Sequence, residues 1–227
     1  MAANKRAGKK SLAQNDYLAP AAPLIETATD VGTSRAFDNG AVTIAFTAQG
    51  PNAATSFTVT SSPGAFTATG PSSPLTVEGL QSNTAYTFTV TATNAAGTSP
   101  ASAASGSVTA TTVPATMTAP TVSSPHGANY DTVSWTAPAN GGKAISLYRY
   151  NSSDGKTGTT ASTSINVTQE QGTSQTYQIR AENANGAGQY SASSASVTTF
   201  SFVPFSVFGF SPFGVFGFSP FGVFGFR

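Results

Sequence analysis

The sequence predicts an all-β protein built from two sandwich domains in tandem. Charged residues make up only 8% of the chain, against about 25% in an average soluble domain. The Glu, Lys, Arg and Leu that favour long helices are scarce, and threonine-rich runs bounded by Gly, Pro, Asn and Ser are typical of strands and turns. One pattern also repeats after about 90 residues, which is the length of a sandwich domain.

The first domain is predicted over residues 23–113, with seven short strands. Val42, Ile44 and Phe46 alternate with small or polar residues, so period-2 geometry places them on one buried face. Phe57, Val59, Leu75 and Val77 follow the same rule, and Leu80 closes a turn. The strands are expected at 24–31, 41–47, 56–60, 65–69, 74–80, 85–94 and 105–111.

The second domain is predicted over residues 114–199 because the first pattern recurs there. Trp135 falls where Phe46 falls, and the turn sequences NAAG and NANG correspond. Residues 112–120 form a short linker with two prolines, which should hold the domains in line. The run Phe88, Val90, Ala92, Asn94 matches Tyr177, Ile179, Ala181, Asn183. Strands are expected at 132–136, 145–150, 164–168, 176–183 and 194–199.

Two stretches resemble fibronectin type III domains. They are WTAPANGGKAISLY, from Trp135, and GLQSNTAYTFTVTATNAAG, which contains Tyr86. The resemblance implies seven-stranded Greek-key sandwiches used for spacing and adhesion, and it does not imply an enzyme. It also implies that the Tyr86 hydroxyl ties back to the backbone near Leu80. Gln175 occupies the corresponding position of the second domain, so this bond is expected only in the first.

A basic arm is predicted at residues 1–22. No apolar run follows its charges, so we expect a protein made in a cytoplasm and not exported by a signal peptide. The arm is interpreted either as a disordered leader or as a segment that docks on an acidic partner. Nucleic acid is not an expected partner, because the charges are few and no aromatic residues are interleaved with them. The basic residues are Lys5, Arg6, Lys9 and Lys10.

A phenylalanine tail is predicted at residues 200–227. The unit VFGFSPFG occurs twice, and prolines recur every eight residues at 204, 212 and 220, which forbids a regular helix. An extended or polyproline-like path is expected. The phenylalanines, eleven of the sixteen in the chain, are the candidate residues for assembly or partner binding: Phe200, Phe202, Phe205, Phe208, Phe210, Phe213, Phe216, Phe218, Phe221, Phe224 and Phe226.

This tail represents roughly 16–33 kcal/mol of apolar burial that needs a partner. Self-association around a rotation axis, or insertion into grooves of a larger assembly, is the favoured interpretation. A segment without fixed structure is an alternative. Membrane insertion is disfavoured because the prolines and glycines break the helix that a bilayer demands. Pairing into β-fibres is a further alternative.

Residues for catalysis or metal binding are not recognisable in the sequence. The chain has no cysteine and a single histidine, His126, in a predicted loop. Its nine carboxylates are scattered, and no phosphate-binding loop or nucleophile elbow occurs. We therefore expect neither an enzyme nor a cofactor.

Together these features favour a structural protein of a tailed bacteriophage, a group in which immunoglobulin-like and fibronectin-like modules are common. The expected location is the virion, as an accessory or decoration component of capsid, neck, tail or fibre. Expected partners are other virion proteins, further copies of the chain in a homo-oligomer such as a trimer, and a glycan or protein on the host surface. The alternative is an adhesin or spacer module that is either displayed on a bacterial surface or secreted.

Overall fold

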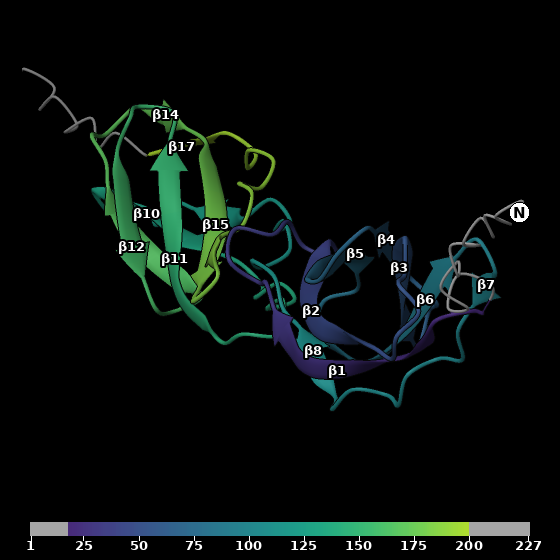
Figure 1. Ribbon diagram of the computed structural model, residues 1–227. Helices are drawn as coiled ribbons and strands as arrows, with labels where there is room; N and C mark the ends of the chain where they lie inside the picture. Colours follow the sequence, from purple (N-terminus) through teal and green to yellow (C-terminus); the bar gives the residue numbers. More distant parts are fainter. Residues whose placement is uncertain (1–17, 200–227) are drawn as a thin grey trace, which may run out of the picture.

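A computed structural model describes residues 18–199, and this range is all-β. Seventeen strands lie in it, and none of these residues is helical. Within this part of the chain there is consequently no helix able to span a membrane. The strands surround two separate hydrophobic cores. We call β1–β8 with their core the first unit and β9–β17 with theirs the second unit (Figure 1).

The first unit has two sheets that face each other across its core. One has the order β1-β2-β5, and the other has the order β4-β3-β6-β7 with β8 also paired to β6. All the pairings between these strands are antiparallel. The strands are β1 (Ala21–Asp30), β2 (Gly40–Gln49), β3 (Ser56–Ser62), β4 (Thr67–Gly70), β5 (Leu75–Leu80), β6 (Thr84–Asn94), β7 (Gly97–Thr98) and β8 (Val108–Ala110).

The second unit repeats this arrangement, and several of its strands are shorter than their counterparts. Its sheets have the orders β13-β10-β9 and β12-β11-β15-β16, and β14 and β17 form a small pair of their own. The strands are β9 (Thr121–Ser123), β10 (Tyr130–Ser134), β11 (Ile145–Ser152), β12 (Thr157–Thr160), β13 (Ser164–Thr168), β14 (Ser174–Gln175), β15 (Tyr177–Asn183), β16 (Gly186–Ala187) and β17 (Val197–Thr198).

The predicted alternation is confirmed in both cores. Val42, Ile44 and Phe46 are buried along β2, and the Phe46 ring lies 5.0 Å from that of Phe57 on β3. The apolar residues of β6 and β15 are buried in the same way. Trp135 differs from expectation, because it follows β10 and is only partly buried. Its ring packs edge-on against Tyr148, at 5.4 Å between centroids.

The last predicted strand of each unit is much shorter than expected. Strands were predicted at 105–111 and 194–199, but only 108–110 and 197–198 pair as strands. The segments before these short strands run alongside the neighbouring strand, β6 or β15. They bond to its backbone through serines spaced by three residues. The Ser102 N–H donates to the Val90 carbonyl, and its Oγ accepts from the Val90 N–H. Ser99, Ser105, Ser191 and Ser194 make the equivalent pairs of bonds.

Replacing Ser102 with alanine is therefore expected to destabilise the first unit. The N–H of Val90 is buried and loses its acceptor, which costs about 1–3 kcal/mol. Urea denaturation followed by far-UV circular dichroism measures the loss. Ser107→Ala is the control, because Ser107 is exposed, and its effect should stay within about 0.5 kcal/mol. Equal effects of the two substitutions would contradict the stabilising role assigned to the bond between Ser102 and Val90.

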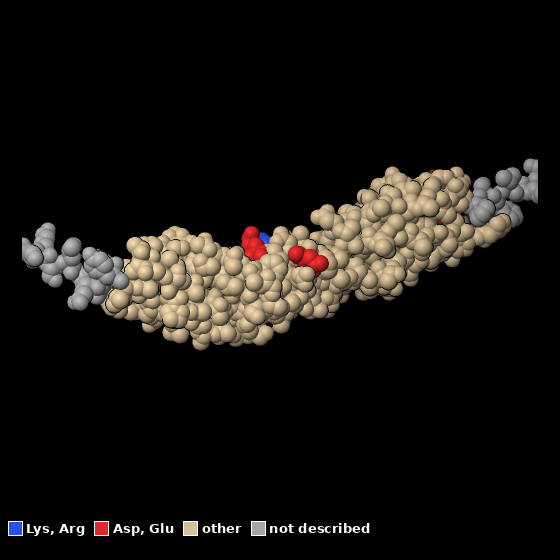
Figure 2. Space-filling model, turned by 90° about the vertical axis from the view of Figure 1, so that its right-hand side faces the viewer, with Lys and Arg blue, Asp and Glu red and all other residues tan. Residues whose placement is uncertain are grey.

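The two units lie end to end in an elongated molecule (Figure 1). The described chain begins beside the turn between β6 and β7, where Asn94 donates to the Leu18 carbonyl. It ends at the opposite end of the molecule, where Thr199 is bound to Thr173. The face shown in Figure 2 carries very few charged side chains.

Candidate functional site

The predicted assembly residues cannot be located in the fold. The phenylalanines of the tail (200–227) and the arm residues Lys5, Arg6, Lys9 and Lys10 lie outside the described residues. His126 is exposed in the loop between β9 and β10, as expected. Across residues 18–199, no group of three His, Cys, Asp or Glu side chains is arranged to hold a metal ion. Two hydrogen-bond networks remain as candidates. One lies between the units, and the other lies at the far end of the second unit.

The linker between the units is buried and hydrogen-bonded in its first part. Thr112, Val113 and Pro114 are buried, as is Thr111 just before them, whereas Thr116, Thr118 and Ala119 are exposed. The Thr112 N–H donates to the Gly141 carbonyl at 2.8 Å, and the Ala115 N–H donates to Ala139 at 2.9 Å. On the side of the first unit, the Val113 N–H donates to Arg35 at 3.0 Å. The linker is therefore a shared structural element of both units, which extends the prediction that it holds them in line.

Two asparagines of the second unit complete this junction. The Asn183 Nδ2 donates to the Thr112 carbonyl at 2.9 Å and to the Asn140 carbonyl at 2.8 Å. The Asn185 Nδ2 donates to the Thr111 Oγ1 at 2.7 Å, and the Asn185 carbonyl accepts from the Ser34 N–H at 2.8 Å. Since Ser34 precedes β2, Asn185 connects the second unit directly to a loop of the first.

The first unit shows what the junction adds to the common pattern. Asn94 is the counterpart of Asn183, and it likewise holds the chain that enters its unit, through the Leu18 carbonyl at 2.9 Å. The counterpart of Asn185 is Ala96, which has no side chain for such a bond. The difference between NAAG and NANG is thus the sequence signal of the junction. The sequence reasoning treated the two turns as equivalent and missed Asn185.

The two adjacent glycines of the stretch WTAPANGGKAISLY also belong to the junction. Gly141 and Gly142 have φ angles of +69° and +86°, a region that residues with a Cβ rarely adopt. A Cβ on Gly141 would lie 2.5 Å from the carbonyl oxygens of both Thr112 and Val113. Beside this turn, a cleft of about 460 Å³ separates the units, lined by Phe37, Ser82, Asn83, Pro138 and Asn140 among others. Glycine is required here for close packing as well as for the turn.

The predicted tyrosine corner is confirmed in the first unit. The Gln81 N–H donates to the Tyr86 hydroxyl at 3.1 Å, one residue beyond Leu80. In the second unit, Gln175 is buried and accepts a hydrogen bond from the Ser153 hydroxyl at 2.6 Å. At the corresponding corner of the second unit, a bond between two side chains therefore takes the place of the bond from a backbone N–H to a tyrosine hydroxyl.

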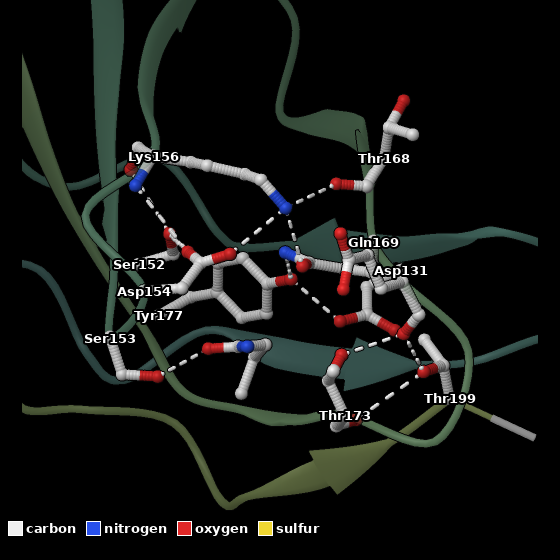
Figure 3. A network of polar contacts seen from close by, with 12 residues as sticks. Asp131, Ser152, Ser153, Asp154, Lys156, Thr168, Gln169, Thr173, Tyr177 and Thr199 are labelled. Carbon is white, nitrogen blue, oxygen red and sulfur yellow. Dashed lines mark hydrogen bonds and ion pairs between the residues drawn. The ribbon is translucent and has the colours of Figure 1, made fainter.

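A buried polar network in the second unit centres on Tyr177 (Figure 3). Its hydroxyl donates to the Asp131 Oδ2 at 2.6 Å and accepts from the Gln169 Nε2 at 2.7 Å. Asp131 is completely buried, and Ser124 donates to its other oxygen. Since Tyr177 matches Phe88 of the first unit, one added hydroxyl distinguishes the two cores at this position. Sequence reasoning assigned Tyr177 only to the core.

The network reaches the surface at Lys156. Its Nζ donates to the Gln169 Oε1 at 2.8 Å and to the Thr168 carbonyl at 3.0 Å, and it lies 2.9 Å from the Asp154 Oδ2. Burial by itself would raise the pKa of Asp154, but the side-chain bond from Ser152 and the bonds and positive charge of Lys156 together outweigh it and lower this pKa. Burial raises the pKa of Tyr177 above its ordinary value, and the bond to Asp131 raises it further.

The end of the described chain is fixed beside this network. Thr199 is buried, and its Oγ1 donates to the Glu170 carbonyl at 2.6 Å. The Gly172 N–H donates to the Thr199 carbonyl at 2.9 Å, and the Thr199 N–H donates to Thr173 at 3.1 Å. Tension applied to residue 200 would consequently reach the β14–β17 pair and its loop directly.

Part of the first unit matches a known protein family. The family "Fibronectin type III domain" matches residues 29–108, from the end of β1 to the start of β8. The chain is similar to chicken CNTN1 FN1–FN3 domains at 17% identity and a TM-score of 0.44, over 80% of this chain and 67% of that one. It is similar to domains from titin at 18% identity and a TM-score of 0.41, over 78% and 68%. No curated protein sequence matches it.

A further similar structure is the sixth fibronectin type III domain from human fibronectin type III domain containing protein 3. It is 23% identical with a TM-score of 0.35, and the match covers 44% of this chain and 95% of that domain. The sheet orders, the corner bond of Tyr86 and the family match point the same way. Residues 29–108 match the fibronectin type III domain family, and the described residues 18–199 form an all-β fold.

Proposed function

We propose that the protein is a non-catalytic structural component of a tailed bacteriophage particle, located in the virion. In this role it is an accessory or decoration protein. Its terminal segments anchor it in the particle, and its sandwich units project outward. The observation that carries the proposal is the tail of eleven phenylalanines that directly follows Thr199. Fibronectin type III domains are typically binding or structural modules, which supports a passive role.

The proposal includes a second fibronectin type III domain. The second unit repeats the sheet orders of the first, and Asn183 holds its incoming chain as Asn94 does. We assign the domains to residues 23–113 and 114–199, each as a seven-stranded Greek-key sandwich. The two-residue strands β7, β14 and β16 are additional to the seven strands of this pattern in each unit.

The tail is the proposed anchor. Its phenylalanines offer roughly 16–33 kcal/mol of burial to a partner that covers them, and the buried attachment of Thr199 transmits the load to the sandwich. The partners are other virion proteins or copies of the same chain, in a closed oligomer such as a trimer. The arm residues Lys5, Arg6, Lys9 and Lys10 contribute a second contact with an acidic surface.

The two units form the displayed part. The buried linker and the asparagine bonds favour one fixed orientation between the units, so the protein acts as a short rod. Its loops then contact a glycan or protein on the host surface, or they cement neighbouring subunits. The scarcity of charge on the face in Figure 2 suits contacts that depend on hydroxyl groups rather than on ion pairs.

Deleting residues 200–227 tests the anchoring role. We expect the copy number of the protein in purified particles to fall at least about tenfold, because the apolar burial that holds it is lost. Quantitative mass spectrometry of wild-type and mutant particles measures it. The control is Ser107→Ala, an exposed substitution that keeps both the tail and the arm and should leave the copy number unchanged. An unchanged copy number after the deletion would refute the anchoring role, and recovery of the protein only in a bacterial surface fraction would favour the adhesin alternative.

A further inference from the structure

A groove on the first unit has the chemistry of an acceptor for apolar side chains. It runs between β1 and the segment 103–106, and its volume is about 170 Å³, on the scale of a single aromatic side chain. Six of its ten lining residues among the described part of the chain have aliphatic side chains, and the others are polar residues and a glycine. Glu26 is the one charged residue among them, and it accepts a hydrogen bond from Thr47. Its apolar lining residues include Pro23, Leu24, Ile25, Ala28, Ala103 and Ala104.

One wall of this groove is an edge strand. β1 stands at the end of the order β1-β2-β5 and pairs only with β2 among the described strands. Leu24 is 57% exposed, and in the described part of the chain only Leu18, Leu24 and Val31 are large exposed hydrophobic residues. An edge strand beside an apolar groove is the arrangement that receives an extended peptide by strand addition.

We propose that this groove binds the phenylalanine tail of a second copy of the chain. The tail is the one segment of this sequence with a matching chemistry: residues 200–226 carry no charge and include eleven phenylalanines. Seven residues without proline, such as 213–219, separate successive prolines, and such a run can lie along a strand edge. This inference rests on the proposed role of the tail in assembly and names the surface that receives it.

The arrangement of the molecule favours a second copy as the source of the tail. The groove belongs to the first unit, whereas the tail follows Thr199 at the far end of the second unit (Figure 1). The hydrogen-bonded junction keeps these two ends apart. Donor and acceptor surfaces at opposite ends of one rod give a head-to-tail contact, which closes into a ring or continues as a filament.

Sedimentation velocity of the full-length protein over a range of concentrations tests the inference. The variants are Leu24→Asp and Ala104→Glu, one on each wall of the groove, and the matched control is Leu18→Asp, which changes an exposed leucine outside the groove. We expect self-association to weaken at least about tenfold in both groove variants, since a carboxylate would be buried without a partner, and to change less than about twofold in the control. A synthetic peptide of residues 211–219 should dissociate the wild-type assemblies.

The outcomes separate this inference from the proposed function. If deletion of residues 200–227 abolishes self-association but neither groove variant weakens it, the groove is not the acceptor, while the tail remains an assembly element. If the protein that lacks residues 200–227 associates as strongly as the full-length protein, the proposed role of the tail fails. A wild-type monomer at all concentrations, whose tail becomes sensitive to protease only in the groove variants, would show folding back within one chain and overturn the second-copy assignment. Thermal unfolding of each variant verifies that the first unit is intact.

Discussion

Tyr177→Phe is expected to destabilise the second unit by about 2–5 kcal/mol. The substitution removes the 2.6 Å bond to Asp131 and the 2.7 Å bond from Gln169. It leaves a completely buried carboxylate with Ser124 as its one remaining side-chain donor among the described residues. Trp135 is the only tryptophan in the chain and packs against Tyr148 of the second unit. Its fluorescence during urea denaturation therefore reports on the affected unit alone.

Tyr86→Phe is the matched control in the first unit. It removes one hydrogen bond, from the Gln81 N–H, and should cost about 0.5–1.5 kcal/mol without moving the tryptophan transition. Equal losses for the two tyrosines would contradict the view that Tyr177 sustains a buried charge.

The same network predicts a dependence on alkaline pH. Because burial and the bond to Asp131 raise the pKa of Tyr177 in the folded protein, the folded state holds the phenol proton more tightly than the unfolded state. The stabilisation is complete below about pH 10, where an unfolded tyrosine is protonated, and declines as the pH rises further. The stability difference between the wild type and Tyr177→Phe should therefore shrink above about pH 10.

Gly141→Ala is expected to open the junction between the units. The new Cβ would meet two linker carbonyl oxygens at 2.5 Å, and the φ angle of +69° is unfavourable for alanine. Both effects displace the linker, and we expect a loss of about 2–4 kcal/mol. Small-angle scattering should show a broader range of interunit distances, and limited proteolysis should cut residues 111–116.

Gly155→Ala separates the two effects. Gly155 has a similar φ angle of +85°, but a Cβ there meets nothing within 4 Å. It should show the backbone cost of about 1–2 kcal/mol with an unchanged scattering profile. An open junction in Gly155→Ala, or an unchanged one in Gly141→Ala, would contradict the proposed packing role. Asn185→Ala, which copies Ala96 of the first unit, should loosen the junction more mildly.

The strands and cores were predictable because they depend on local alternation. Val42, Ile44 and Phe46 sit in a strand whose period of two is visible in the sequence, and they are buried as expected. The three-residue spacing of Ser99, Ser102 and Ser105 is equally local. Of these serines only Ser105 falls in a predicted strand, because a serine that replaces strand pairing with side-chain bonds leaves no hydrophobic pattern.

The polar sites were not predictable because their members are far apart in the chain. Asp131 and Tyr177 are separated by 46 residues, and Asn185 and Thr111 by 74. Each residue alone resembles an ordinary strand or turn residue. The comparison of the two repeats was the available signal: Tyr177 replaces Phe88 and Asn185 replaces Ala96, and both replacements add a hydrogen-bonding group at a buried place.

The most direct measurement compares the solution state of the intact chain with that of a chain ending at Thr199, by sedimentation velocity at equal concentrations. The account predicts that the intact chain forms oligomers or larger assemblies, and that the shortened chain, which keeps both described cores, sediments as a folded monomer. Two well-behaved monomers with the phenylalanines accessible to solvent would contradict it.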